Sequence, residues 1–384
     1  MLDPLRFSDP IVKVYEACVD ELLINLAKHF NPQRLTLTQG FRYDVELLAR
    51  LGAIKKESAA IIAKHMANNA EEIRQAIEKA MLEALSDVEP ELQQAANESV
   101  LKTAEMPVSE GIEQTLTAYS RQAVNQLNLV NASMVSGAAN AFRSGTLAAQ
   151  SILSAETGKL ILGASTLQEA VKKAVKAMSS AGITGFMDSM GRNWSAEAYT
   201  RLVTKTTCQN AANQGVMDRN AQYGNDLIWV RTNATARPGC YPWQGKVISM
   251  ENRSRDVTDG SGRTVHAYAA SETTYGQPDG IYGCNCNHGP MNVFIPGFSV
   301  VRAAKVSKAE SDKGYQLTQV QRKLERSVRY AKRDAEMLKA AGASKEDIAL
   351  ATAKVKQKQK QVREFVKAHP GVLVRDYSRE AIYN

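Results

Sequence analysis

Three cysteines and a histidine occur where they could meet at one site. Cys284, Cys286 and His288 alternate along one short segment, and Cys240 precedes them in the same glycine-rich region. Residues two apart on an extended chain point to the same side, so these side chains can converge. Thiolates and imidazoles are the usual zinc ligands, and four of them make a closed structural site. The pattern predicts a zinc site formed by Cys240, Cys284, Cys286 and His288, with His266 as an alternative ligand.

Two other interpretations of this cluster stay open at the level of sequence. The thiols could simply be reduced side chains packed in a tight loop. Alternatively, Cys240, Cys286 and His288 could hold a catalytic zinc, which keeps one position open, with Glu251 or Glu272 as the base. The chain has no phosphate-binding glycine loop, no Gly-x-Ser-x-Gly and no His-Glu-x-x-His motif. We therefore predict a protein that is not an enzyme.

Basic residues gather in the last part of the chain. The 384 residues include 48 Lys and Arg against 40 Asp and Glu, and the stretch from Val301 onward accounts for the whole excess. Arg322, Arg326, Arg329 and Arg333 are spaced by four, three and four, which places them on one helical face. Such a row suits non-specific contact with the phosphates of double-stranded DNA. The alternative is the solvated flank of a coiled coil.

A tight turn precedes one of the expected strands. Arg237, Pro238, Trp243 and Gly245 lie in this turn, and we interpret them as a structural motif. Trp243 is large enough to anchor the core of a small domain. Recognition of a partner by Arg237, Trp243 and Lys246 is the alternative interpretation.

Secondary structure must hold these candidate residues in place. In the first half of the chain, the sequence predicts helices. Apolar spacing predicts helices over 11–30, 44–51, 56–88, 109–142 and 195–222, with Asn31-Pro32 and Pro90 as terminators and Ser195 as an N-cap. The helix over 109–142 has an apolar stripe, while its opposite face carries Asn and Gln. An amide-rich outer face suggests contact with another protein. The longest uncharged stretch, 122–142, holds eight Asn, Gln or Ser residues, so no membrane span is expected. A secretory signal is also not expected.

The second half of the chain has a different residue pattern, which predicts strands as well as helices. Strand-like alternation over 226–232 and 246–250, crowded by Gly and Pro, predicts a small irregular β-rich domain. A basic helical hairpin follows, with Gly342 ending its first helix and Ser344 capping the second. The expected fold class is α+β, predominantly α, with a helical region over 1–190, a helix plus β-rich domain over 191–300, and the hairpin over 301–384.

Several motifs together resemble one protein family, the phage minor capsid protein 2 family, which is related to Mu-type phage head morphogenesis proteins. The resemblance covers roughly 190–384, and residues 1–190 fit only in their helical texture. The motifs are Ala236-Arg237-Pro238, Trp243-Gln244-Gly245-Lys246-Val247, Thr274-Tyr275-Gly276, Asn285-Cys286-x-His288, Phe294-Ile295-Pro296-Gly297 and the segment from Tyr315 to Arg326.

The resemblance implies a structural virion protein in the phage head. Such a protein is expected near the portal in several copies, after synthesis in the host cytoplasm. Its expected partners are the portal or other head proteins and DNA, and its expected role is in head assembly, DNA packaging or genome ejection. A zinc-dependent enzyme or effector delivered with the genome is the alternative.

Overall fold

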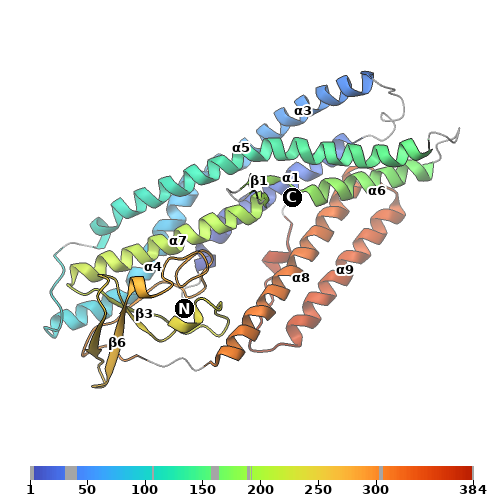
Figure 1. Cartoon of the computed structure of the whole chain (residues 1–384). Helices are drawn as coiled ribbons and strands as arrows, with labels where there is room; N and C mark the ends of the chain where they lie inside the picture. Colours follow the sequence, from blue (N-terminus) through green and yellow to red (C-terminus); the bar gives the residue numbers. More distant parts are fainter. Residues whose placement is uncertain are drawn as a thin grey trace. The chain divides into compact units, whose positions relative to one another are not determined.

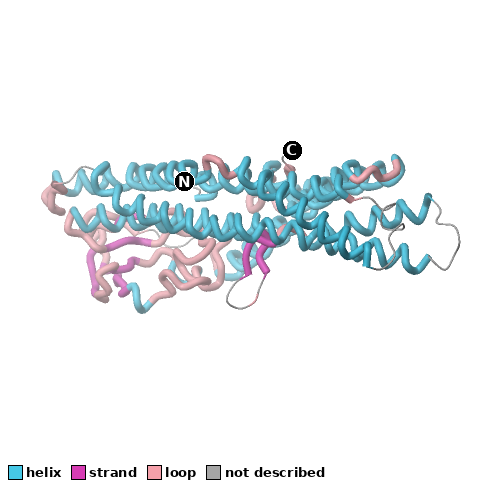
Figure 2. Tube along the Cα trace, turned by 90° about the horizontal axis from the view of Figure 1, so that it is seen from above, coloured by secondary structure: helices cyan, strands magenta, loops and turns pink. Residues whose placement is uncertain are grey.

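A computed structural model describes residues 4–30, 41–105, 108–156, 164–187, 191, 193–301 and 306–382. Helices dominate, and a small mixed sheet accompanies them (Figures 1 and 2), so the predicted α+β class is confirmed. The α-helices are α1 (Pro4–His29), α3 (Phe41–His65), α4 (Asn69–Asn97), α5 (Val108–Glu156), α6 (Ala164–Ala181), α7 (Ala196–Gln222), α8 (Lys308–Ala340) and α9 (Lys345–Lys367). Within the described ranges, no helix is both long and apolar enough to span a membrane.

Two predicted caps are confirmed. The Ser195 hydroxyl accepts a hydrogen bond from the Ala198 amide at 3.2 Å, and the Ser344 hydroxyl accepts one from the Asp347 amide at 3.1 Å. Each bond satisfies an amide that the first helical turn leaves without a partner. Gly342 ends α8 in a left-handed conformation with φ +70°, as expected for a helix C-terminus.

The prediction that Pro90 ends a helix is wrong, because Pro90 lies inside α4. An internal proline costs about 3 kcal/mol through its lost hydrogen bond and its ring clash. Contacts on both sides of it hold the helix together: Arg219 binds the Glu89 carboxylate and the Ser299 hydroxyl donates to Glu91. Tertiary packing thus overrides the local preference. The other predicted terminator, Asn31-Pro32, lies outside the described residues, and α1 ends at His29.

The apolar stripe of α5 is buried as its spacing predicts, and the stripe residues Ile112, Leu116, Ala123, Leu127, Val130, Met134 and Ala138 are almost fully covered. The opposite face stays in solvent between Arg121 and Arg143 and carries no charge there. Its exposed residues include Gln122, Asn125, Asn128, Leu129, Ala132, Ser136 and Asn140.

The chain forms two compact units. One comprises Met1–Ile11, Asn69–Gln126 and Arg201–Gln319, and the other comprises Val12–Asn68, Leu127–Thr200 and Val320–Asn384. Each unit therefore draws on all three regions that we distinguished in the sequence, because α1, α5, α7 and α8 contribute residues to both.

The first unit contains a mixed sheet of five short strands, namely β3 (Leu227–Trp229), β4 (Val247–Ser249), β5 (Arg255–Thr258), β6 (Thr264–Ala269) and β7 (Asn292–Val293). Their order is β5-β6-β4-β3-β7; β4 and β6 are parallel and the other pairs are antiparallel. The core of the sheet is formed by Leu227, Val247, Ala267, Phe294 and Val301. A separate hairpin pairs β1 (Thr184–Met187) with β2 (Asn193–Ser195).

Candidate functional site

Arg237 organises the loops beside the sheet. Its Nη1 atom donates to the carbonyl of Cys284 at 2.9 Å and its Nη2 atom donates to the carbonyl of Gly280 at 3.0 Å. A guanidinium presents a rigid fork of donors, so this single side chain fixes the path of the segment that leads to Cys286.

The same segment is packed too tightly for side chains at two of its glycines. A Cβ atom on Gly280 would lie 1.9 Å from the Thr274 carbonyl oxygen, and one on Gly283 would lie 1.7 Å from that of Gln277. Only glycine fits where backbones approach so closely. The loop therefore has one compact path.

The structure gives Trp243 a different place from the one we predicted. It lies in a short 3-10 helix, Tyr241–Trp243, and is only partly buried. Its ring packs edge-on against Tyr268 of β6, with 5.6 Å between the centroids. Gly245 follows with φ +71°, and its amide donates to the Val230 carbonyl at 2.8 Å. Trp243 thus covers one face of the sheet, and the buried core is aliphatic apart from Phe294.

Helix α7 positions the Cys/His segment from its other side. Lys205 Nζ donates to the Asn287 side-chain oxygen at 2.5 Å and to the Asn285 carbonyl at 3.3 Å. One turn later, Gln209 donates to the Gly289 carbonyl, and one further turn on, Asn213 accepts the Met291 amide at 3.0 Å. Our sequence reasoning missed this support. Its signal was a Lys, a Gln and an Asn spaced by four on one helix.

Cys240, Cys286 and His288 come together in the interior of the first unit. Their ligand atoms lie within 4.8 Å of one another. The Cys286 Sγ atom is 3.3 Å from His288 Nδ1, and the Cys240 thiol donates to the Gly280 carbonyl at 3.3 Å. The exposed fractions are 1% for Cys240, 0% for Cys286 and 5% for His288.

The other two predicted ligands do not belong to this group. Cys284 is partly exposed, and its thiol is not among the three converging donors. His266 lies on β6, where its Nδ1 atom is 2.7 Å from the exposed carboxylate of Asp256. The side chains of Cys284 and Cys286 diverge because Asn285, between them, adopts a left-handed conformation with φ +56°. The alternation that we assumed needs an extended chain.

The electrostatics of the group favour a thiolate on Cys286. The neighbouring Cys240 thiol lowers the pKa of Cys286, and the contact with His288 lowers it further, against the opposing effect of burial. The proximity of Cys286, together with burial, raises the pKa of Cys240. Of the two thiols, Cys286 therefore loses its proton first.

Three buried polar atoms around the group have no hydrogen-bond partner among the described residues. They are Arg237 Nε, the Tyr282 hydroxyl and His288 Nε2. A buried polar atom without a partner costs about 1–3 kcal/mol, so the region has unused capacity to bind water or an ion.

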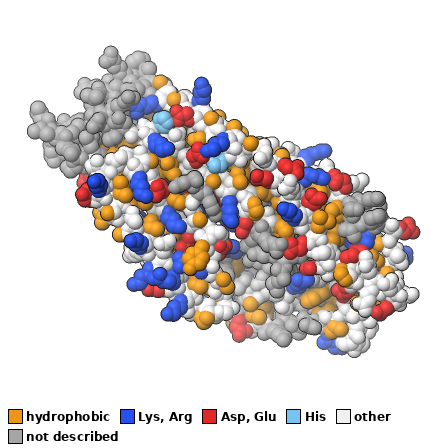
Figure 3. All heavy atoms as spheres, turned by 180° about the vertical axis from the view of Figure 1, so that it is seen from behind, with side chains coloured by type: hydrophobic (Ala, Val, Ile, Leu, Met, Phe, Trp, Pro, Cys, Tyr) orange, Lys and Arg blue, Asp and Glu red, His pale blue; other side chains and the backbone are white. Residues whose placement is uncertain are grey.

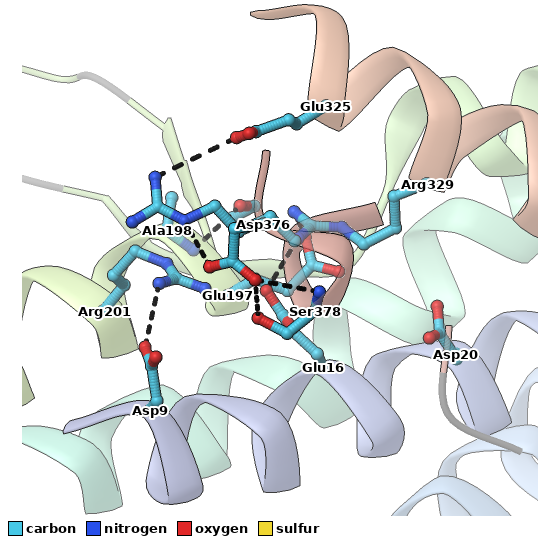
Figure 4. Close-up of polar contacts among 12 residues, drawn as sticks. Asp9, Glu16, Asp20, Glu197, Ala198, Arg201, Glu325, Arg329, Asp376 and Ser378 are labelled. Atoms are coloured by element: carbon cyan, nitrogen blue, oxygen red, sulfur yellow. Dashed lines mark hydrogen bonds and ion pairs between the residues drawn. The ribbon is translucent and has the colours of Figure 1, made fainter. Parts of the chain in front are cut away.

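The predicted row of four arginines does not face solvent as a row. Arg329 and Arg333 are only 7% and 3% exposed. Arg329 Nη1 lies 2.7 Å from Glu16, and the Glu197 carboxylate is 3.9 Å from its Nη2 atom (Figure 4). Arg322 is half-buried and Arg326 is exposed. For Arg329 and Arg333, the prediction of a DNA-facing surface is wrong.

Arg333 is held by two carboxylates of the second unit. Its Nε atom lies 2.6 Å from Asp20 of α1, and its Nη2 atom donates to Glu197 of α7. Charges this deeply buried are stable only when they are paired and hydrogen-bonded. The sequence could not reveal the pairing, because the partners precede the arginines by 136 and 313 residues.

A different helix presents the aligned cations. Lys356, Lys360, Arg363 and Lys367 of α9 repeat the spacing of four, three and four, and all four are exposed. We call them the α9 basic face. On the face of the molecule that Figure 3 shows, basic and acidic side chains of the described residues lie side by side.

The family assignment rests on comparison with known proteins. The family model described as phage minor capsid protein 2 matches residues 4–367. The chain belongs to the phage minor capsid protein 2 family. A curated relative, a structural protein of Lactococcus phage LL-H, is 26% identical over 367 residues, which cover 94% of this chain and 95% of the relative. No solved structure gives a significant match. The match includes residues 4–190, for which the sequence motifs gave no specific signal.

Proposed function

We propose that this minor capsid protein is a low-copy component of the phage head that docks near the portal and contacts the packaged DNA without sequence preference. Family membership supports a structural role in the virion. A structural role rather than a catalytic one also fits the full burial of the best cluster of reactive groups, Cys240, Cys286 and His288.

The α9 basic face is the observation that carries the proposed contact with DNA. Four exposed cations on one helical face match the charge of a phosphate backbone. The Glu364 carboxylate lies 3.7 Å from Lys360, but both side chains are about 60% exposed. An ion pair so open to water contributes little, and Lys360 remains free to exchange its partner for a phosphate.

The salt dependence of DNA binding tests this contact. If four phosphates are neutralised, log affinity should fall with log salt at a slope of about −3.6, from about −0.9 per phosphate. Replacing Lys356, Lys360, Arg363 and Lys367 with Gln should remove nearly all of that slope. The matched control replaces the exposed Lys308, Lys313, Lys323 and Lys339 with Gln, which removes the same charge from other sites. Equal slopes in the two variants would refute the α9 contact.

The uncharged outer face of α5 carries the proposed docking on the portal. A long solvent-exposed helix face normally carries charges, whereas the one between Arg121 and Arg143 carries amides, Ala, Ser and the exposed Leu129. Removing that face from water costs no desolvation of charge, which suits contact with another protein.

Co-expression with the phage portal protein tests the docking. Leu129→Lys with Asn140→Lys places two charges on the α5 face and should abolish co-purification. Gln94→Lys on the exposed side of α4 is the control and should leave the complex intact. If the α5 variant still co-purifies with the portal, this face is not the docking surface. Purified particles should contain a low, fixed number of copies of the chain.

A further inference from the structure

Two thiols and an imidazole converge in the first unit with spacing suited to a metal ion. In a tetrahedral zinc site, Zn–S bonds of about 2.3 Å and Zn–N bonds of about 2.0–2.1 Å place sulfur and nitrogen ligands about 3.6 Å apart. Cys286 Sγ and His288 Nδ1 lie 3.3 Å apart, and the Cys240 donor atom lies within 4.8 Å of both. The Cys286–His288 pair therefore already has nearly the spacing of a bound ion, and an approach of about 1 Å or less by the Cys240 thiol completes it.

We propose that Cys240, Cys286 and His288 bind one zinc ion. This donor set is soft enough to select zinc over magnesium or calcium, which prefer oxygen ligands. The ion would join the turn around Cys240 to the segment that α7 holds at Asn285 and Asn287. The inference goes beyond the proposed function, because it involves neither α9 nor the outer face of α5.

The role of the ion is structural. A catalytic zinc must be reached by substrate, and all three ligands are almost fully buried. The loops that carry the three ligands contain little regular secondary structure, since they run through turns and short 3-10 helices between the strands. A metal that joins two loops stabilises such a region because binding free energy adds to folding free energy.

The fourth coordination position of the zinc ion would be filled by an oxygen ligand near Tyr282. The Tyr282 hydroxyl is buried and has no hydrogen-bond partner among the described residues, and Tyr282 lies on the same loop as Cys286. A zinc-bound water would give this hydroxyl its missing partner. Cys284 is not the fourth ligand, because its thiol lies outside the converging group.

Elemental analysis of the full-length protein, purified under reducing conditions without chelator, tests the site. We expect about one zinc per chain, near zero in Cys240→Ser and Cys286→Ser, and about one in Cys284→Ser and His266→Ala. The last two variants are matched controls. Each removes a potential ligand in the same region that is not one of the three proposed ligands. Metal-free wild-type protein would overturn the proposal, as would a Cys240–Cys286 disulfide found by mass spectrometry in the reduced sample, or zinc lost only in Cys284→Ser.

Cobalt substitution keeps the test decisive if a ligand variant fails to fold. Wild-type protein loaded with Co²⁺ should show the intense visible bands of a tetrahedral site and thiolate charge transfer in the near ultraviolet; an octahedral spectrum without charge transfer would overturn the proposal. Tyr282→Phe should keep zinc but release it to a competing chelator with an affinity about 10–100-fold weaker, as for other residues that orient a ligand. If Tyr282→Phe binds zinc with the same affinity as wild type, the fourth ligand does not lie near Tyr282.

Discussion

Arg333 is the residue whose replacement best tests the buried charge cluster. Arg333→Met keeps most of the aliphatic stem and removes the guanidinium, which leaves the buried carboxylates of Asp20 and Glu197 without their closest cation. Removing one partner of a buried pair costs about 3–5 kcal/mol, since an uncompensated charge stays in the interior. The exposed Arg326, one of the same predicted row, should lose no more than about 0.5 kcal/mol on the same substitution.

Urea unfolding followed by circular dichroism measures the difference. With a slope of about 3 kcal/mol per molar urea, the expected cost lowers the midpoint of Arg333→Met by about 1–1.7 M, while that of Arg326→Met stays within about 0.2 M of wild type. The urea midpoint of Arg333→Lys should lie between those of Arg333→Met and Arg326→Met. A single ammonium group cannot bind two carboxylates in the way that the guanidinium does.

The pH dependence of that deficit is a second readout. Without Arg333, less positive charge offsets the burial of Asp20 and Glu197, so we expect the pKa values of their carboxyls to rise. The protonated forms are then compatible with the fold, so the lost stability should be partly recovered as the pH falls and should worsen as it rises. A deficit that is small at neutral pH, or that grows on acidification, would show that these charges are not held as the structure has them.

Two further predictions concern Glu89 and Gly283, both in the first unit. Burial raises the pKa of Glu89, but hydrogen bonds from Arg219 and Tyr223 outweigh it and leave the pKa below its usual value. This carboxylate therefore stabilises the fold above its unfolded pKa and ceases to do so as the pH falls; Glu89→Gln should cost about 1–3 kcal/mol at pH 7 and show less acid-induced loss than wild type in melts at several pH values. Gly283→Ala should destabilise the fold by about 3 kcal/mol through overpacking, whereas Gly52→Ala, on the open face of α3, should stabilise it by up to about 1 kcal/mol; similar denaturation midpoints for the two variants would contradict the close packing at Gly283.

Local signals in the sequence predicted several helices and caps but not all of the helix boundaries, since α3 and α4 divide the predicted 56–88 helix at 66–68. The stripe of α5 is buried where its spacing of three and four placed it, and Ser195 and Ser344 cap their helices. These features depend on neighbours within one or two turns, which a sequence displays directly. Pro90 defeated the same reasoning, since contacts from α7 and from Ser299 hold α4 together on both sides of it.

The candidate metal site was only partly predictable. Cysteine and histidine types drew attention to the right segment, and three of the five candidate residues converge. The choice among them depended on backbone conformation. Asn285 and Tyr282 both adopt φ near +56°, which non-glycine residues seldom do, so the segment is not extended and Cys284 turns away. The spacing of residue types alone does not reveal such a turn.

The two rows of cations show why helical spacing cannot identify a DNA-binding face by itself. The rows on α8 and α9 have the same spacing, yet Arg329 and Arg333 are buried while the α9 basic face is exposed. From the sequence we placed the hairpin in a region of its own, 301–384, and the DNA contact on its first helix. In the second unit α8 instead bonds to α1, α6 and α7, whereas the described polar contacts of α9 with other elements cluster at its first turn, around Asp347. A helix enclosed on several sides buries its cations and must supply carboxylates for them. Exposure, which the sequence does not give, therefore decides which row is free to meet phosphates.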